Sequence, residues 1–164
     1  MRLRGVGATA TTATTERTEL EDVYREHGKR LWWALLAYSG DRELASDAVA
    51  ETFARALAAK RPIRAPADWI WRVAFRLAAK EMKRRARHVE AIEESYEMDE
   101  RTHDLMTALE QLSARQRGAI VLHYYAGYST REIASMTDST SATVAVHLHR
   151  GRKKLRELLE GFDG

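Results

Sequence analysis

Basic side chains recur along residues 72–87 in steps of three and four, which place them on one face of a helix. Residues 60–87 hold ten lysines and arginines against two acids, so this face has little compensating charge. Aromatic rings flank it, and such rings can stack on unpaired bases at about 1–3 kcal/mol each. The pattern favours a surface for single-stranded nucleic acid over a plain solvated helix face, although Trp69 alone fits a core position equally well. The side chains are Arg72, Arg76, Lys80, Lys83 and Arg87, with Trp69, Trp71 and Phe75 beside them.

A second basic cluster lies on the last helical segment and holds Arg150, Arg152, Lys153, Lys154 and Arg156. Such cations can neutralise phosphates, and each contact steepens the log–log salt dependence of binding by about 0.9. Polar and apolar side chains precede the cluster, where a recognition helix reads base edges. The alternative is a terminal helix whose cations only complement its dipole. The turn and capping box before this segment disfavour that alternative. The candidate base-reading residues are Ser141, Thr143, Val146, His147 and Arg150.

The sequence contains no recognisable catalytic site. The six histidines are scattered, and His147 and His149, two apart on a helix, diverge rather than converge on a metal ion. We find no glycine-rich phosphate loop or Ser-His-Asp set. The absence of cysteine removes thiol catalysis and cysteine-type zinc sites. We therefore expect no catalytic residue, no metal and no cofactor, and an enzyme such as a nuclease is disfavoured.

The amino-acid composition also indicates where in the cell the protein is expected to lie. A chain without cysteine fits a reducing cytoplasm. No apolar run approaches the roughly 18 residues that span a bilayer. The basic N-terminus is not followed by the apolar stretch of a secretory signal. We expect a cytoplasmic protein with no membrane insertion.

The elements that must position these surfaces are helical, and no segment has the period of a strand. Residues 1–18 are rich in Ala and Thr and lack periodicity, which predicts a flexible tail. From Glu19 apolar side chains recur at helical steps until Gly40 and Asp41, and Asp41 can cap a second helix over residues 42–59. Residues 60–66 contain both prolines and form a loop, and a third helix begins at residue 67 or 68.

An acidic stretch divides the chain. Residues 88–104 carry seven acids against one arginine and few apolar residues, which indicates a flexible linker. The sequence therefore predicts an all-α fold with two small helical domains, at residues 19–87 and 105–160. The second domain opens with a helix near residues 105–112, and Ser113 caps the next helix. That helix is expected to turn Ile120, Val121, Tyr124 and Tyr125 inward.

The last part of the chain has the pattern of a helix-turn-helix. Gly127 ends the preceding helix, and Ser129 with Glu132 has the spacing of a capping box. A short helix over residues 130–136 leads to a turn at residues 137–140, and Thr140 or Ser141 caps a long final helix. Two helices joined by a short turn, the second of them basic and amphipathic, are typical of DNA-binding units.

The two halves together resemble the bacterial sigma factors, and within them the small extracytoplasmic-function group. The resemblance covers residues 19–87 and 104–160. It rests on an ordered set of motifs rather than on the helix-turn-helix alone. These motifs are DRELASDAVAETFARAL, PADWIWRVAFRLAAKEMKRRAR, LEQLSARQRGAIVLHYYAGYSTREIASM and TVAVHLHRGRKKLRELL.

The resemblance implies a non-enzymatic role in transcription initiation, with core RNA polymerase, promoter DNA and an anti-sigma factor as partners. The segment with Asp47, Glu51 and Arg55 would bind core polymerase, although a solvated surface pair remains open as an alternative for the two carboxylates. The third helix would hold the −10 element with a flipped base through Trp69, Arg72, Arg76, Lys80, Lys83 and Arg84. The helix-turn-helix would read the −35 element through Arg131, Ser141, Thr143, Val146, His147, Arg150, Lys153 and Lys154.

The sequence departs from the family pattern at several of these positions. Arg76 and Lys80 stand where Asn and Asp are common, which favours phosphate contacts over base reading. Asp138 stands where the turn commonly has Gly, and Asp tolerates a positive φ better than most residues. Ala145, Val146 and His147 replace commonly basic or polar residues, and Val146 could meet a thymine methyl group. An unusual promoter preference is expected.

A stand-alone helix-turn-helix regulator is the second hypothesis. Such a protein would bind an operator without polymerase. The N-terminal half argues against it, because an acidic helix followed by an aromatic and basic helix has no role in a protein that only binds operators. A stable complex with core polymerase would separate the two hypotheses.

Overall fold

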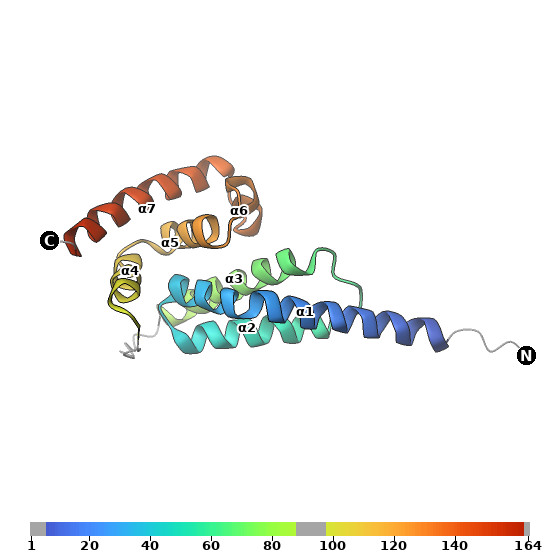
Figure 1. Cartoon of the computed structure of the whole chain (residues 1–164). Helices are drawn as coiled ribbons and strands as arrows, with labels where there is room; N and C mark the ends of the chain where they lie inside the picture. The colour runs from blue at the N-terminus through green and yellow to red at the C-terminus, as the bar shows by residue number, and fades with distance from the viewer. Residues whose placement is uncertain (1–5, 88–97, 163–164) are drawn as a thin grey trace, which may run out of the picture.

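The computed structural model describes residues 6–87 and 98–162, and every element in these ranges is a helix (Figure 1). The prediction of an all-α fold is confirmed. The N-terminal half contains α1 (Val6–Ser39), α2 (Arg42–Leu57) and α3 (Pro66–Arg85). The C-terminal half contains α4 (Glu100–Glu110), α5 (Ala114–Ile120), the π-helical turn η1 (Val121–Tyr125), α6 (Thr130–Met136) and α7 (Ser141–Phe162).

The C-terminal part of α1 packs against α2 and α3. Leu31, Leu35 and Ile70 are fully buried between these helices, which follows from their helical spacing. Gly40 ends α1 with a φ of +69°, and Asp41 caps α2 by accepting a hydrogen bond of 2.9 Å from the Leu44 backbone N–H. Local capping chemistry therefore sets the corner between α1 and α2, as the sequence predicts.

The first turns of α1 differ from the prediction. Residues 6–18 are helical, so the expectation of a tail without secondary structure is wrong there. Alanine favours the helix. Within it, the hydroxyls of Thr15 and Thr18 donate to the carbonyls of Thr11 and Thr14 at 2.9 Å, so threonine is accommodated inside the helix. Extending a helix that is already packed from Leu20 onward requires no new nucleation. This part of α1 projects beyond the other helices (Figure 1).

The start of the C-terminal half also differs. Helix α4 begins at Glu100, where Asp99 accepts a hydrogen bond of 2.7 Å from the Thr102 backbone N–H. The last residues of the predicted linker, 100–104, are therefore helical. An acid at a helix N-terminus complements the dipole, so the acids that indicate a linker also favour a helix start. Residues 88–97 of the predicted linker lie outside the described residues.

The turn η1 corrects a third expectation. Ile120 and Val121 are buried as predicted, whereas Tyr124 and Tyr125 are 55% and 44% exposed. The backbone N–H of Ala126 bonds the carbonyl of Val121 at 3.1 Å, five residues back. Tyr124 and Tyr125 lie inside this wider turn, whose side-chain period differs from that of an α-helix, so an α-helical extrapolation places the two tyrosines on the wrong face.

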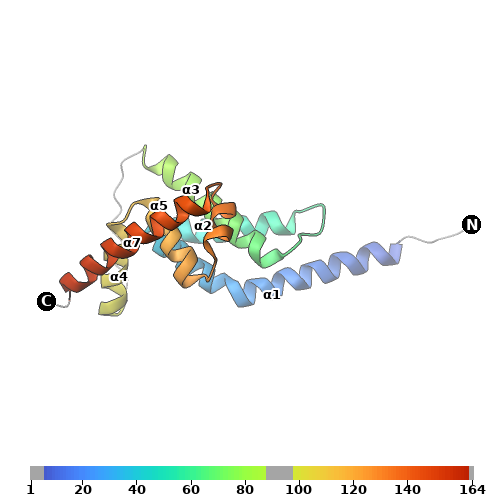
Figure 2. The ribbon, with the colours of Figure 1, turned by 90° about the horizontal axis from the view of Figure 1, so that it is seen from above.

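The two halves pack against each other and share a continuous set of buried residues. Helices α4 and α5 and the turn η1 lie against α1, and α5 packs under α7. Figure 2 shows α5 to α7 stacked over the bundle of α1 to α3. Among the described residues, none of the helices combines the length and the apolar character of a membrane span.

Candidate nucleic-acid interfaces

The helix-turn-helix is fixed by local hydrogen bonds. Ser129 and Glu132 form the predicted capping box, with bonds of 2.7 and 3.2 Å, and the Ser129 backbone N–H lowers the pKa of the Glu132 carboxyl. Asp138 takes the left-handed conformation, with a φ of +51°, in the turn. Thr140 caps α7 by accepting from the Thr143 backbone N–H at 3.1 Å. The helix-turn-helix prediction is confirmed.

The exposed face of α7 carries most of the predicted −35 residues. Ser141, Thr143, Val146, Arg150 and Lys153 are exposed, and His147 is half-buried. The opposite face packs inward through Val144 and Leu148. Arg131 is exposed at the start of α6. Lys154 differs from the others, because its Nζ donates to the carbonyl of Gln111 at the end of α4.

The aromatic residues of α3 divide into two groups. Trp71 and Phe75 are 2% and 5% exposed and stack on each other, with 6.2 Å between ring centroids. The expectation that these two rings can stack on bases is therefore wrong, because they belong to the core of the α1–α3 bundle. Trp69 is half-buried and lines a shallow hollow with Ile63 and the basic side chains of the 60–65 loop. Trp69 is therefore the one ring of these three that stays partly accessible.

The basic residues of α3 differ in how far their charge is available. Lys80 and Lys83 are exposed, whereas Arg72 is half-buried and its Nε has no hydrogen-bond partner among the described residues. Arg84 donates two bonds of 2.6 and 2.8 Å to Glu81. These bonds, together with those from Arg85, lower the pKa of the Glu81 carboxyl to about 2. Arg84 therefore presents less net charge than its type suggests.

Arg76 has a partner from the other half of the molecule. Its Nη2 lies 3.0 Å from the Oδ1 of Asp138, in the turn between α6 and α7. The two side chains are 50% and 80% exposed. The structure thus joins a residue of the predicted −10 surface to the helix-turn-helix.

The acidic face of α2 is exposed as predicted. Asp47, Glu51 and Arg55 all face solvent, and Arg55 Nε donates to Glu51 Oε1 at 2.7 Å. Phe53 is buried as expected. Thr52 is fully buried, and its hydroxyl donates to the Ala48 carbonyl at 2.6 Å, so its role in α2 is structural.

A groove runs between the two halves and brings several predicted residues together. Its cavity volume is about 1220 Å³. Leu122, Ile133 and Met136 contribute apolar lining from the C-terminal half. The predicted site residues that line it are Asp47, Glu51, Arg76, Lys80, Lys83, Arg84 and His147. The groove therefore borders all three predicted surfaces.

Comparison with known proteins places this arrangement in a family. Residues 102–155 match the family model "Sigma-70, region 4". The chain is 32% identical over 168 residues to the ECF RNA polymerase sigma factor SigL of Mycobacterium tuberculosis, covering 90% of this chain and 93% of that protein. The chain belongs to the extracytoplasmic-function (ECF) sigma factors.

Further relatives of this ECF sigma factor agree. The RNA polymerase sigma factor CarQ of Myxococcus xanthus is 28% identical, covering 85% of this chain and 88% of that protein. The structure of the sigma factor RpoE in complex with the anti-sigma factor NepR from Bartonella quintana has a TM-score of 0.69 and 25% identity. It covers 88% of this chain and 96% of that one. The fold is also that of CnrH in complex with the cytosolic domain of CnrY, with a TM-score of 0.69 and 23% identity over 93% and 94% of the two chains.

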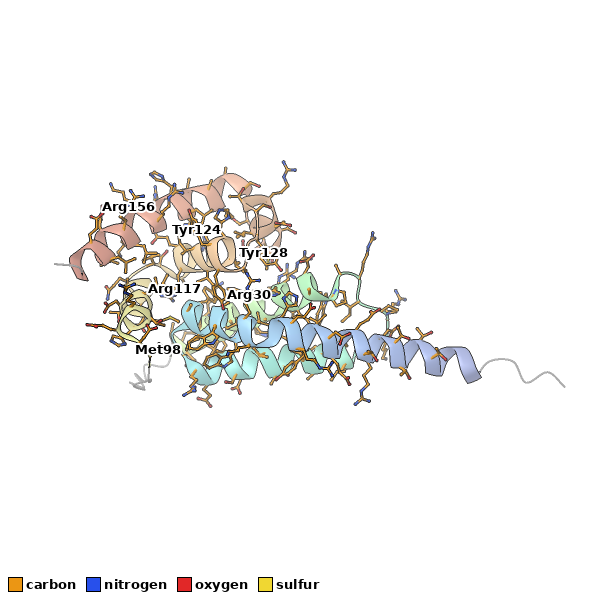
Figure 3. The ribbon with its side chains drawn as sticks, viewed as in Figure 1. Arg30, Met98, Arg117, Tyr124, Tyr128 and Arg156 are labelled. Atoms are coloured by element: carbon orange, nitrogen blue, oxygen red, sulfur yellow. The ribbon has the colours of Figure 1, made fainter. Side chains whose placement is uncertain are left out.

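Two residues of this sigma factor have packing roles that the sequence motifs do not indicate. Arg117 is 9% exposed, and its guanidinium donates to the carbonyl of Tyr38, at the end of α1, and to carbonyls at the end of α4 (Figure 3). Gly151 lets α7 approach α5, because a Cβ there would lie 3.2 Å from Ile120. A glycine among charged residues of a long helix is the signal that could have indicated the close packing of α7.

Proposed function

We propose that this ECF sigma factor binds core RNA polymerase and directs it to promoters. In this proposal the acidic face of α2 docks on polymerase. Helix α3 and the loop before it hold the −10 element, and α7 reads the −35 element. The roles are non-enzymatic, and the site of action is the cytoplasm, where polymerase works. The observation that carries the proposal is the capped helix-turn-helix, with an exposed basic α7, in the same chain as a second basic helix and an exposed acidic one.

Reconstitution with core polymerase tests the proposal. The purified chain is added to core enzyme and genomic DNA from the same cells, and transcript 5′ ends are mapped. We expect starts at a restricted set of sites that depend on the chain. If no stable complex with core forms and the chain alone binds a duplex tightly, the stand-alone regulator becomes the better description.

Reversal of charge on α2 is expected to weaken polymerase binding. Glu51→Lys replaces an exposed acid and also breaks its ion pair with Arg55. We expect core affinity to fall about tenfold, equivalent to about 1.4 kcal/mol, because a like charge then faces a basic partner. Titration of fluorescent chain with core enzyme measures it. Glu19→Lys makes the same charge reversal at an exposed position of α1 and should leave the affinity for core enzyme unchanged. Equal affinity for the wild type and Glu51→Lys would count against docking through α2.

Removal of a single cation from α7 is expected to weaken promoter binding. Arg150→Ala should cost about 1–3 kcal/mol if the guanidinium contacts a base in a bidentate way. Lys154→Ala is the matched comparison, because Lys154 is held at the end of α4 and should contribute less. Holoenzyme binding to a promoter mapped as above measures both variants. A larger loss for Lys154→Ala would reverse the assignment of the DNA-facing side of α7.

An anti-sigma factor is the third partner in the proposal. The groove between the halves supports it, because apolar side chains line it together with basic side chains of α3 and with Asp47 and Glu51 of α2. An amphipathic segment whose acids face α3 would complement the apolar lining and the basic side of the groove. Acylation of Lys80 in a complex isolated from cells tests the placement. Protection of Lys80 is expected, and unchanged reactivity would place such a partner elsewhere.

A further inference from the structure

The π-helical turn η1 brings a tyrosine hydroxyl to the last helix. Nη1 of Arg152 on α7 donates to the hydroxyl oxygen of Tyr124 at 2.9 Å, although 28 positions separate the two residues. In Figure 3 the Tyr124 side chain lies beside α7. An α-helical course would turn Tyr124 inward, so the wider turn makes this contact possible, and turns of this kind are frequent at functional sites. Arg152 belongs to the basic cluster of α7, but neither residue is among those predicted to read the −35 element.

The Tyr124 side chain is itself held in place. Its ring packs edge-to-face on the ring of His123, with 4.9 Å between centroids and an interplanar angle of 83°. His123 Nδ1 lies 2.7 Å from the carbonyl oxygen of Tyr128, and because a carbonyl only accepts, the imidazole donates from this nitrogen. The backbone N–H of Tyr128 donates to the Leu122 carbonyl at 3.0 Å. The position of the hydroxyl that Arg152 meets is therefore fixed by the turn.

The hydroxyl orients the Arg152 guanidinium without neutralising it. Arg55 and Arg84 are paired with carboxylates, which offset their charge. Arg152 is bonded to a neutral hydroxyl instead, and the described residues provide it with no carboxylate within ion-pair distance. A guanidinium has several N–H donors, and most of those of Arg152 remain for another acceptor. An oriented cation of this kind suits a bidentate contact with a phosphate.

The place of Arg152 along α7 favours the phosphate backbone over the bases. Arg152 follows Ser141, the first candidate base-reading residue, by eleven residues. Such a separation makes about three turns of an α-helix, so the two residues lie on the same side of α7 and about 16 Å apart along its axis. The major groove is only about 12 Å wide. A helix that reads bases from its first turns therefore carries Arg152 to the phosphates at the edge of the groove.

We propose that Arg152 binds a phosphate of the −35 duplex and that Tyr124 is its positioning residue. The guanidinium supplies the charge, and the hydroxyl holds it in the orientation that the phosphate requires. This inference rests on the proposed function, in which α7 reads the −35 element. Phosphate contacts fix the register of a protein on its duplex, so the turn η1 sets how α7 enters the groove.

Salt-dependent binding of the holoenzyme tests the phosphate contact. The probe is a fluorescent duplex that contains a promoter mapped in the reconstitution above, and it is titrated at several salt concentrations. Arg152→Gln should weaken binding about tenfold and reduce the log–log salt slope by about 0.9, the contribution of one phosphate contact. Lys29→Gln removes a cation from an exposed position of α1 and should leave both quantities unchanged.

Removal of one hydroxyl tests the positioning role of Tyr124. Tyr124→Phe keeps the ring on His123 and deletes only the oxygen that Arg152 meets. We expect binding to weaken about threefold. Adding Tyr124→Phe to Arg152→Gln should cause no further loss, because both residues act through one contact. Tyr125→Phe is the matched control, since the contacts of Tyr125 with Arg30 use its ring and its backbone carbonyl, and it should bind as the wild type does.

A purely structural bond between η1 and α7 would give different results. The proposal is supported if Tyr124→Phe unfolds in urea as the wild type does and its binding loss disappears in the Arg152→Gln background. An unchanged salt slope for Arg152→Gln, additive losses in the double variant, or an equal loss for Tyr125→Phe overturns the proposal, while initiation by the wild-type holoenzyme still stands. A wild-type chain that gives no initiation with core polymerase overturns the proposed function instead.

Discussion

Trp71→Ala is expected to lower the free energy of unfolding by about 3–5 kcal/mol, the usual cost of truncating a buried aromatic side chain. Trp71 is 2% exposed and stacks on Phe75. Its indole N–H donates to His27 Nδ1 at 3.3 Å, and alanine would leave that acceptor without its partner. The cavity would lie where α3 meets α1, so the whole N-terminal half should lose stability. Urea unfolding followed by circular dichroism measures the effect.

Trp69→Ala is the matched control, because it removes the same side chain two residues away. Trp69 is half-buried beside the loop hollow, so we expect a smaller loss of stability. Binding of the holoenzyme to single-stranded −10 DNA should instead weaken by about 1–3 kcal/mol, the range for one base stacked on an aromatic ring. An unfolding curve of Trp71→Ala that overlays the wild type would contradict the core assignment of Trp71.

The sequence predicts those features of the fold that depend on local chemistry. Asp41, Ser113 and Ser129 cap the helices that their types and spacing indicate, since a cap needs only its own side chain and the next turn. The exposed face of α7 follows from its apolar period in the same way. Asp138 takes the positive φ that its place in the turn requires.

Features that depend on packing between distant segments could not be predicted. An aromatic side chain beside a basic stripe can lie on either face of a helix, and the tertiary fit alone assigns Trp71 to the core and Trp69 to the surface. A single wider turn at η1 moved Tyr124 and Tyr125 outward, and no pattern in the sequence marks it. The pairing of Arg76 with Asp138 depends on how the halves meet, so neither residue predicts the other.

Arg117→Met is expected to destabilise the chain and to loosen the junction of its halves. The guanidinium is buried, and Nη1 donates to the carbonyls of Leu109 and Leu112, both at 3.3 Å, while Nε donates to Tyr38. Burial lowers the pKa of Arg117, because desolvation disfavours its charge. Methionine has similar length and no donor, so we expect a loss of about 1–3 kcal/mol for each carbonyl that stays buried and unpaired.

The matched control for Arg117→Met is Arg115→Met, two residues earlier at an exposed position of α5, where the change should stay within about 0.5 kcal/mol. Because the bonds of Arg117 join the end of α1 to the end of α4, its loss should also loosen the contact between the two halves, and urea unfolding followed by circular dichroism measures the loss of stability. Arg117→Lys keeps the charge, but a single ammonium cannot reproduce the guanidinium fork, so it should rescue only in part. Full rescue by lysine would mean that charge, rather than the span between α1 and α4, is what this position requires.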